Sequence, residues 1–515
     1  MIGVRGLSVR FGPVLALDGV DLDVAPGVIH ALAGQNGSGK TTLLKVLGGA
    51  LHPTSGAVIL DDKPVSFPGP AQATRAGVSM VFQELSLFPH LSGFANIFIG
   101  HEPVRFGFLD RRRIREDAQS LVSDLGFPEL DLSIAVSALR VAEQQVVEIL
   151  KCLSHSPQII LFDEPTASLT SREAVPLLRT MRGLRDRGYT VVFVSHRLEE
   201  IFDVSDRVTV LRDGKITLDG PTSSFDQANV IEAMLGRALT DLYPRHEKTP
   251  SAEAFLRLEH MSCPGLAPVD LEIHVGEVLG IAGAVGSGSS LFAEMLGGLR
   301  RIDAGRVIVR GRPVRLRNPA QALDAGIAYL PEDRRTDALF QQLSIGTNMS
   351  MPLMFEDHSP LVHRGGFIHR GRERSAIQSG IVESGVRPPD PRRAVGNLSG
   401  GNQQKVVLGR WFLRDVPCLV MNNPTVGIDI GSKADIYRHI ADLADSNHAV
   451  VVVSNYNDEL LAIADRIVVF REGAPIASYE HGQVDANELA RLTMGGLSTE
   501  GASSRTTMAV GKEGS

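Results

Sequence analysis

The chain has 515 residues, with 52 basic and 59 acidic side chains and a formal net charge of -7. It is too long for one hydrophobic core, because single cores stop growing at about 250–300 residues, so at least two domains are expected. The slightly acidic balance offers no general attraction for nucleic acid or anionic lipid, and neither is expected as the main partner.

The chain opens with MIGVRGLSVRFG, which has neither the charged start nor the apolar core of a signal peptide. Its apolar runs have the length of strands, as in AVVVVS at 449–454, and fall short of the ~20 residues that cross a bilayer. Any membrane association is therefore expected to arise through a partner. The cysteines Cys152, Cys263 and Cys418 are widely spaced, and we interpret them as reduced packing thiols of a cytosolic protein.

The first chemical motif follows the predicted strand GVIHALAG at 27–34. It reads GQNGSGKTT at 34–42 and matches the phosphate loop pattern GxxxxGK[ST], with a helical stretch after it. In this pattern backbone N–H groups form an anion nest, Lys40 reaches the outer phosphates and Thr41 can hold Mg²⁺. A chance glycine-rich turn is the alternative. The predicted phosphate-binding residues are Gly34, Gln35, Asn36, Gly37, Ser38, Gly39, Lys40, Thr41 and Thr42.

Two further strands end in polar side chains. IILFDE at 159–164 places Asp163 where it could bind Mg²⁺ and Glu164 where it could orient or deprotonate a water. A solvated strand end is the alternative for this pair. VVFVSH at 191–196 places His196 where it could sense a γ-phosphate, although an isolated histidine at such a place is more often structural.

The same series occurs a second time in the chain. ALAGQNGSGKTTLLKVLGG at 31–49 aligns with GIAGAVGSGSSLFAEMLGG at 280–298, an offset of 249 residues from Gly34 to Gly283. Later segments align at an offset of 259, as LFDEPTASLT at 161–170 does with VMNNPTVGID at 420–429. We predict two α/β domains with largely parallel sheets. The boundaries are a first domain at 1–240, a linker at 241–251, a second domain at 252–498 and a disordered tail at 499–515.

LSGGNQQ at 398–404 supplies a hydroxyl, two glycines and a probable helix start in Ser399, Gly400 and Gly401. The order of phosphate loop, glutamine loop, LSGG, DE and His resembles the ATP-binding cassette (ABC) proteins over residues 1–498. This resemblance implies two tandem cassettes, each with a parallel sheet and a helical subdomain. It also implies two composite ATP sites, each joining the phosphate loop of one cassette to the LSGG segment of the other.

The first composite site matches the family pattern throughout. By resemblance, Glu164, His196 and Gln83 are its catalytic residues, and Thr41, Gln83 and Asp163 surround Mg²⁺. Phe11 matches the aromatic residue that stacks on adenine, with core packing as the alternative. Ser399, Gly400 and Gly401 complete the site, which is expected to bind ATP with Mg²⁺ and hydrolyse it.

The second composite site departs from the pattern at nearly every position. The substitutions are Ser289 for lysine, Glu332 for glutamine, Asn422 and Asn423 for the two acids, Asn455 for histidine, and Arg140 and Ala142 in the facing LSGG segment. Loss of a general base alone costs about 10²- to 10⁴-fold in rate, so hydrolysis is not expected there. Retention of ATP is left open, since Gly283, Gly286 and Gly288 would still permit backbone contacts.

The chain is most similar to the ATPase subunits of bacterial monosaccharide importers of the ribose, xylose and galactose type, through segments such as PEDRRTDAL at 331–339 and GIDIGSKADIY at 427–437. The resemblance implies two transmembrane permease subunits, an extracytoplasmic sugar-binding protein and a peripheral position at the cytoplasmic face of the inner membrane. A nucleoside importer is the near alternative. A ribosome-associated translation factor is the distant one, disfavoured by the short, non-basic linker. The sequence names neither the sugar, nor the permease stoichiometry, nor a role for the tail.

Overall fold

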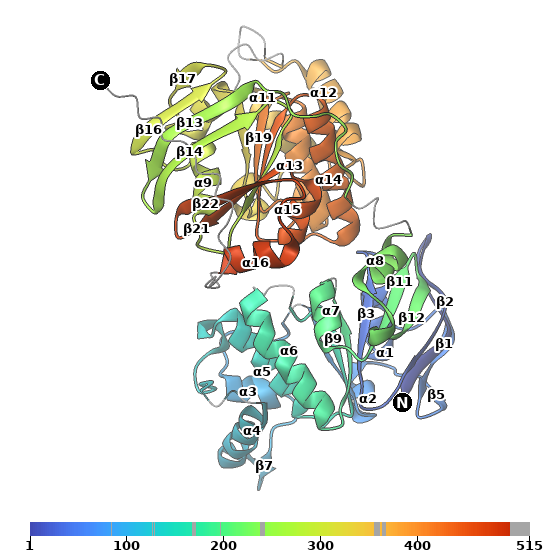
Figure 1. The fold of residues 1–515 in the computed structure, drawn as a ribbon. Helices are drawn as coiled ribbons and strands as arrows, with labels where there is room; N and C mark the ends of the chain where they lie inside the picture. Colours follow the sequence, from blue (N-terminus) through green and yellow to red (C-terminus); the bar gives the residue numbers. More distant parts are fainter. Residues whose placement is uncertain are drawn as a thin grey trace. The chain divides into compact units, whose positions relative to one another are not determined.

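The structure is a computed structural model that describes residues 1–83, 85–125, 127, 129–166, 171–195, 197–236, 243–354, 361–362 and 367–494. The chain divides between Asp241 and Leu242 into two compact units, with Asp429–Gly431 grouped with the first. Each unit is an α/β domain built on a six-stranded and a four-stranded sheet, and the predicted fold class is confirmed (Figure 1).

The larger sheet of the first unit consists of six strands: β3 (Ile29–Gly34), β6 (Val78–Val81), β9 (Ile159–Asp163), β10 (Thr190–Val194), β11 (Arg207–Arg212) and β12 (Lys215–Pro221). Their order is β12-β11-β3-β10-β9-β6, and all neighbours pair in parallel except β11 with β12. Every residue of β3, β9 and β10 is buried, as is typical of parallel strands covered on both faces. The predicted motifs follow the carboxyl ends of these strands.

A second, antiparallel sheet in this unit was not predicted from the sequence. It consists of β1 (Ile2–Phe11), β2 (Val14–Val24), β4 (Ser55–Leu60) and β5 (Lys63–Val65), in the order β2-β1-β4-β5. Apolar residues of β1 and β2 share one core with the helix that follows the phosphate loop, α1 (Lys40–Leu47). This packing holds the end of β1 in a fixed relation to the phosphate loop.

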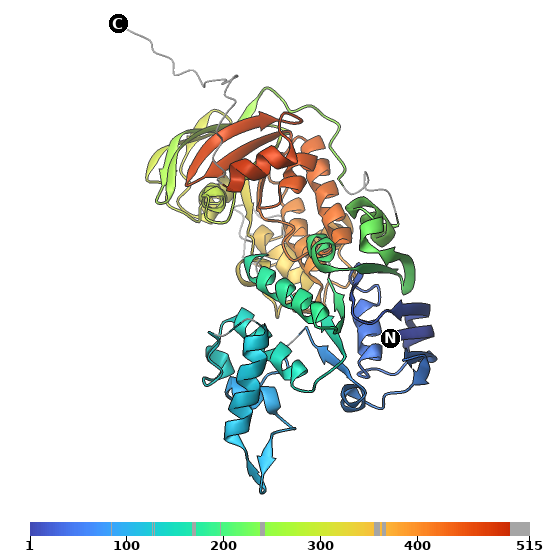
Figure 2. The same ribbon diagram turned by 60° about the horizontal axis from the view of Figure 1, so that its bottom comes forward.

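The remaining helices of the first unit are α2 (Pro70–Arg75), α3 (Gly93–Phe98), α4 (Arg111–Leu125), α5 (Val141–Leu153), α6 (Ser171–Asp186), α7 (Leu198–Val204) and α8 (Gln227–Leu235). Helices α3, α4 and α5 enclose a core of their own, and Figure 2 shows them as a group beside the sheet. A short hairpin, β7 (Val104–Arg105) with β8 (Phe108–Leu109), precedes α4. The predicted helical subdomain is therefore present in this unit.

The second unit repeats the two larger sheets of this plan strand for strand. Its larger sheet has the order β18-β19-β20-β15-β21-β22, formed by β15 (Val278–Ala282), β18 (Ile327–Leu330), β19 (Cys418–Asn422), β20 (Ala449–Ser454), β21 (Arg466–Arg471) and β22 (Ala474–Glu480). Its antiparallel sheet has the order β14-β13-β16-β17, formed by β13 (Ala254–Cys263), β14 (Leu266–His274), β16 (Ala304–Val309) and β17 (Arg312–Val314). The repeat seen in the sequence is thus a repeat of topology.

The helices of the second unit are α9 (Ser289–Leu296), α10 (Pro319–Asp324), α11 (Ile345–Met354), α12 (Arg370–Ser384), α13 (Gly400–Phe412), α14 (Ile430–Asp445), α15 (Asn457–Ile463) and α16 (Ala486–Met494). Helices α11, α12 and α13 contact one another and share a core with the larger sheet. Helix α13 begins at the LSGG segment, so the predicted helix start is confirmed.

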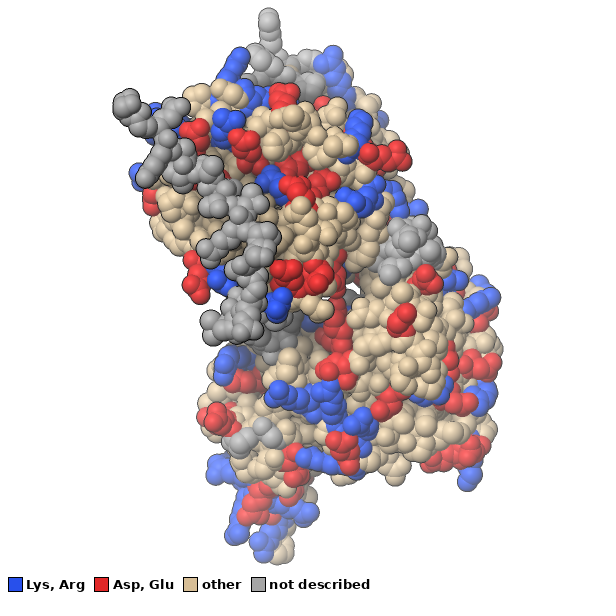
Figure 3. All heavy atoms as spheres, viewed as in Figure 1, with Lys and Arg blue, Asp and Glu red and all other residues tan. Residues whose placement is uncertain are grey.

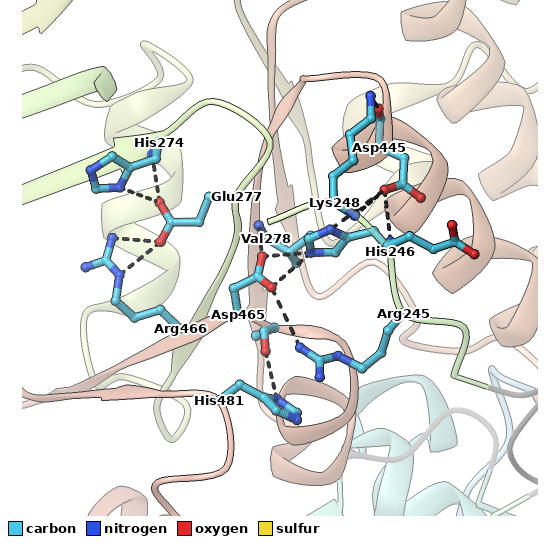
Figure 4. Close-up of polar contacts among 12 residues, drawn as sticks. Arg245, His246, Lys248, His274, Glu277, Val278, Asp445, Asp465, Arg466 and His481 are labelled. Carbon is cyan, nitrogen blue, oxygen red and sulfur yellow. Dashed lines mark hydrogen bonds and ion pairs between the residues drawn. The ribbon is translucent and has the colours of Figure 1, made fainter. Parts of the chain in front are cut away.

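Part of the predicted linker is bound to the second unit. We call residues 245–248 the strap (Figure 4). The side chain of His246 is only 3% exposed, and its Nε2 lies 2.8 Å from Asp465 Oδ2. The same carboxylate accepts a hydrogen bond from the Val278 backbone N–H at 2.9 Å, and Arg245 Nη2 lies 3.7 Å from its other oxygen. The strap therefore binds the carboxylate that links the start of β15 to the start of β21.

A second carboxylate completes the attachment of the strap. Asp445 Oδ1, at the end of α14, accepts backbone hydrogen bonds from Glu247 at 2.9 Å and Lys248 at 3.0 Å. The hydrogen bond with Asp465 raises the pKa of His246 above its usual value, with a further contribution from the charge of Asp445. A charged imidazolium is thus favoured between two carboxylates.

All three cysteines are free and buried, as predicted, and burial raises the pKa of Cys152 and Cys418 to about 12.

Among the described residues, no helix has the length and apolar character needed to cross a membrane. On the face drawn in Figure 3, acidic and basic side chains are interspersed.

Candidate functional site

The phosphate loop of the first unit has a backbone that only glycine permits at two points. A Cβ on Gly34 would lie 2.3 Å from the Leu211 carbonyl oxygen, and one on Gly39 would lie 2.6 Å from the Ala16 carbonyl oxygen. Gly39 also has a φ of 104° and forms the left-handed N-cap of α1. The loop is therefore packed tightly between β11 and β2 and opens a helix, as anion nests do.

Lys40 lies inside this loop and is 5% exposed. Its Nζ donates hydrogen bonds to the carbonyl oxygens of Gly34 and Gln35, both at 2.8 Å. Burial lowers the pKa of Lys40, and the nearby charges of Glu164 and Asp163 oppose that change. Among the described residues, the hydrogen-bond partners of the ammonium are two neutral carbonyls of its own loop. An incoming phosphate would supply a negatively charged partner.

The metal-binding prediction rests on Thr41 and Asp163, which the structure brings together. Thr41 Oγ1 donates to Asp163 Oδ1 at 2.9 Å, and Asp163 is 2% exposed at the end of β9. Burial raises the pKa of Asp163, while the Thr41 hydrogen bond acts in the opposite direction. A hydroxyl and a carboxylate oxygen side by side fit the oxygen ligands that Mg²⁺ prefers.

Glu164 and Gln83 also lie together. Glu164 has a φ of 46°, which turns the chain at the end of β9, and its Oε2 accepts a hydrogen bond from Gln83 Nε2 at 3.3 Å. A positive φ at a non-glycine residue is sparsely populated and is often found at active sites. His196, the third predicted catalytic residue, lies outside the described residues.

Phe11 is 50% exposed at the end of β1, so the alternative of core packing is wrong. It faces Val14 across the β1–β2 hairpin, and β2 then packs against the phosphate loop at Ala16. An exposed aromatic ring beside such a loop suits stacking on a nucleobase.

In the second unit the phosphate loop keeps its backbone and loses its cation. Gly288 has a φ of 97°, close to that of Gly39, and again forms the left-handed N-cap of a helix. Ser289 takes the place of Lys40 and is 3% exposed. Its Oγ lies 3.1 Å from Ser287 Oγ, so a neutral hydroxyl pair stands where the first unit has a lysine in its loop.

At the carboxyl end of β19, the second unit forms hydrogen bonds equivalent to those at the end of β9, but between groups of different charge. Ser290 Oγ donates to Asn422 Oδ1 at 3.2 Å, as Thr41 does to Asp163. Asn423 has a φ of 45°, and its Nδ2 donates to Glu332 Oε2 at 3.1 Å. Both units therefore join an amide to a carboxylate at this edge. The residue after the strand supplies the carboxylate in the first unit, as Glu164, and the amide in the second, as Asn423.

This exchange was missed by reasoning from the sequence, which treated Glu332 and Asn423 as separate losses. The signal was present, because the two offsets pair Gln83 with Glu332 and Glu164 with Asn423. A second miss concerns the adenine position. Cys263 ends β13 and faces Leu266 as Phe11 faces Val14, yet it is buried and carries no ring.

The LSGG helix starts also differ between the units. Ser399 is the N-cap of α13, and its Oγ accepts a hydrogen bond from Asn402 Nδ2 at 3.0 Å. At the corresponding N-cap of α5, the Arg140 side chain is 86% exposed and forms an ion pair with Glu143 at 2.9 Å. The second unit therefore offers a small hydroxyl and two glycines, whereas the first offers an arginine held by its own helix.

Comparison with known proteins identifies the family. A family model described as ABC transporter matches residues 17–167 and 266–426. The chain belongs to the ABC transporter family. Both of its units are matched, so each is an ABC cassette, and the predicted family and tandem arrangement are confirmed.

Three relatives match both cassettes together. The chain is 41% identical over 496 residues to "Ribose import ATP-binding protein RbsA 3" of Rubrobacter xylanophilus, covering 96% of this chain and 98% of that one. It is 40% identical over 490 residues to "Ribose import ATP-binding protein RbsA 1" of Streptomyces coelicolor, covering 95% of each. It is 37% identical over 498 residues to "Putative ribose/galactose/methyl galactoside import ATP-binding protein 1" of Burkholderia ambifaria, covering 96% and 95%.

Proposed function

We propose that this chain is the ATP-hydrolysing subunit of an importer for a monosaccharide of the ribose, xylose or galactose type. The observation that carries the proposal is the match over nearly the whole chain to relatives named as ribose import ATP-binding proteins. The paired cassettes and the tightly packed phosphate loop of the first cassette agree with it.

One composite site would carry the chemistry. It would join residues 34–42, Gln83, Asp163, Glu164 and His196 of the first cassette with Ser399, Gly400 and Gly401 of the second. Lys40 supports this role because it is buried without an anionic hydrogen-bond partner in its own loop. Ser399 and the two glycines support it because they open a helix with donors free to bind a phosphate.

ATP and Mg²⁺ are the cofactors of the proposed site. The phosphates would be held by residues 34–42, the adenine by Phe11, and Mg²⁺ by Thr41 and Asp163 with Gln83 near it. The bound metal would neutralise phosphate charge during hydrolysis. Gln83 donates a hydrogen bond to Glu164 and so holds that carboxylate as an acceptor, which is the form a general base requires. His196 would contact the γ-phosphate.

The other composite site would bind nucleotide without hydrolysing it or serve as structure alone. Asn423 offers no proton acceptor of carboxylate basicity, and its Oδ1 is already bound by the Asn455 backbone N–H at 3.0 Å. In this site Ser289 replaces the lysine that would offset the phosphate charge. The neutral Asn422 and Asn423 avoid the repulsion that two carboxylates would exert on those phosphates. Arg140 and Ala142 on the facing helix lack the hydroxyl and glycine of the LSGG pattern.

The proposed partners are two transmembrane permease subunits and an extracytoplasmic sugar-binding protein. The chain would lie peripherally at the cytoplasmic face of the inner membrane, with membrane contact through the permease. We do not expect nucleic acid as a partner, since the net charge is negative.

A pull-down tests this assignment. The Glu164→Gln protein, trapped with ATP, would be isolated from detergent-solubilised native cells and its companions identified by mass spectrometry, with Lys40→Ala as the matched control that should not close on ATP. Co-purification of a polytopic permease is expected. Its sugar-binding partner would then be screened against sugars and nucleosides, and ribosomal proteins without a permease would contradict the proposal.

A further inference from the structure

The antiparallel sheet of the second cassette carries a groove with a basic lining. Its volume is about 840 Å³, and its side chains include Arg301, Arg306, Arg315 and Arg317. The other lining residues are apolar or glycine, so no carboxylate takes part. None of the lining residues belongs to a phosphate loop, a DE segment or the LSGG helix start, and the groove is therefore separate from the ATP motifs.

Strand register explains how the arginines come together. Val307 of β16 pairs with Val314 of β17, and Arg306 and Arg315 are the residues that adjoin this last pair on the two chain segments. Leu316 is 2% exposed, whereas Arg315 and Arg317 on either side of it are exposed. Like charges directly across a strand pair repel each other. The sheet therefore maintains a local cost in stability.

Glu259 of β13 stands across from Arg306 in the β13–β16 pair, but it forms no ion pair with that arginine. Within the described part of the chain, none of the four side chains makes an ion pair or a hydrogen bond. Other arginines of the same cassette do have such partners: Arg257 Nε lies 2.6 Å from Glu272 Oε1, and Arg300 Nε lies 2.6 Å from Glu294 Oε2. The groove thus concentrates positive charge whose donors are available to a ligand.

The first cassette provides an internal reference for this scaffold. At the offset of 249 residues, the four arginines correspond to His52, Ala57, Ser66 and Pro68. Strands β4 and β5 form the same hairpin there, with Val58 paired to Val65. The same hairpin therefore forms without arginine at these positions, so the fold does not require it.

We propose that this groove binds a small molecule carrying two phosphate groups. The planar guanidinium presents paired N–H donors that match phosphate oxygens, and four of them can serve two phosphates. The volume lies within the range of about 300–1,000 Å³ that holds small ligands. A concave site of this size fits a soluble molecule better than the plane of a membrane.

Calorimetric titration with fructose 1,6-bisphosphate as the probe tests the proposal. The full chain with Glu164→Gln would be saturated with ATP and Mg²⁺, so that the probe cannot occupy a phosphate loop. Saturable 1:1 binding is expected, weakened at least tenfold in the Arg306→Gln/Arg315→Gln variant. Arg312→Gln, on the same hairpin and outside the lining, should leave the affinity within twofold of the parent.

The stability of the double variant gives a second readout. A structural role for the arginines would lower its melting temperature, whereas removal of unpaired repulsion should leave that temperature unchanged or raise it. Absence of probe binding, equal binding by the double variant, or binding of anionic vesicles without the soluble probe would overturn the proposal. ATP affinity and co-purification with a permease are measured separately, so failure here leaves the transport assignment intact.

Discussion

The carboxyl ends of β9 and β19 form the same hydrogen-bonded arrangement from different chemistry. Thr41–Asp163 corresponds to Ser290–Asn422, and Gln83–Glu164 corresponds to Glu332–Asn423. The φ values of Glu164 and Asn423 differ by only 1°, at 46° and 45°. The backbone and hydrogen-bond pattern of a cassette can thus be retained while the lysine and both acids are lost.

The buried support behind each edge is also retained. Glu200 accepts hydrogen bonds from Thr166 and Ser195, and Glu459 accepts them from Thr425 and Ser454. Both carboxylates are nearly inaccessible to solvent. Because each accepts hydrogen bonds from two buried hydroxyls, their shared role is to stabilise the folded cassette. At these two strand edges the differences therefore lie in the groups that would touch nucleotide, while the buried support is the same.

The largest expected effect concerns the residue that follows each strand. Glu164→Gln should lower steady-state ATPase of the assembled complex by about 10²- to 10⁴-fold, because the candidate general base is lost. Asn423→Ala should change the rate little, because Asn423 is not a base. Phosphate release under saturating ATP measures both.

Thermal melting of both variants serves as the control, since the Asn423 side chain is hydrogen-bonded to Glu332, Asn422 and Asn455 and the residue has a positive φ. Comparable losses of ATPase in two folded variants would mean that both composite sites hydrolyse ATP.

The phosphate-loop cation should give the next largest contrast. Lys40→Ala should weaken ATP binding by about 10- to 100-fold, as charged hydrogen bonds contribute roughly 1.5–3 kcal/mol. Ser289→Ala should have little effect on the same titration. Equilibrium dialysis with labelled ATP in the Glu164→Gln background separates the two, and a strong effect of Ser289→Ala would place nucleotide binding in the second cassette.

A third contrast concerns two corresponding aspartates at the starts of β11 and β21. Asp206 accepts the Ile29 backbone N–H at 2.8 Å and pairs with Arg185 at 3.0 Å. Asp465 accepts the Val278 N–H and pairs with His246 of the strap. Arg185, the partner of the first aspartate, is always charged, whereas His246, the nearer partner of the second, can lose its proton.

The pKa of His246 is raised in the folded state by the Asp465 hydrogen bond. A raised pKa stabilises the folded form fully below the unfolded value of about 6.5, and this stability is lost as the pH rises through the folded pKa. His246→Gln should therefore lower the free energy of unfolding by about 1–2 kcal/mol at pH 5.5 and by less at pH 9. Arg245, Lys248 and Asp445 also face this histidine and are unchanged in the variant.

Trp411 provides the measurement, because it is the only tryptophan of the chain and lies in α13 of the second cassette. Urea unfolding followed by its fluorescence should show the pH-dependent loss. Arg185→Gln should leave this transition unchanged at both pH values. An effect of His246→Gln that is equal at pH 5.5 and pH 9 would show that the strap acts through packing alone.

The smallest expected effect comes from the adenine position. Phe11→Ala should weaken ATP binding by about 0.5–1.5 kcal/mol, the usual contribution of an aromatic contact beyond its buried area. Val14→Ala on the same hairpin and Cys263→Ala in the second cassette are the matched controls, and neither should alter the affinity. An unchanged affinity in Phe11→Ala would remove Phe11 from the site.

Local sequence patterns predicted the parallel sheets, the phosphate loops and the start of α13 because glycine patterns and buried apolar runs have local causes. The antiparallel sheets were missed, since β1 pairs with β4 across some 50 residues and its alternation is weak. The exchange between Glu332 and Asn423 depends on contacts across 91 positions. Attachment of the strap to Asp465 was hidden for the same reason, as the contact spans 219 positions.

The strap is part of the folded second cassette, so the segment that joins the two cassettes also contributes to the structure of one of them. Because both cassettes are in one chain, each molecule contains one cassette with Asp163 and Glu164 and one with Asn422 and Asn423. Separate subunits of the same two kinds would assemble into like as well as unlike pairs, in proportions set by their concentrations. The covalent link between the cassettes therefore fixes their ratio at one to one in the proposed transporter.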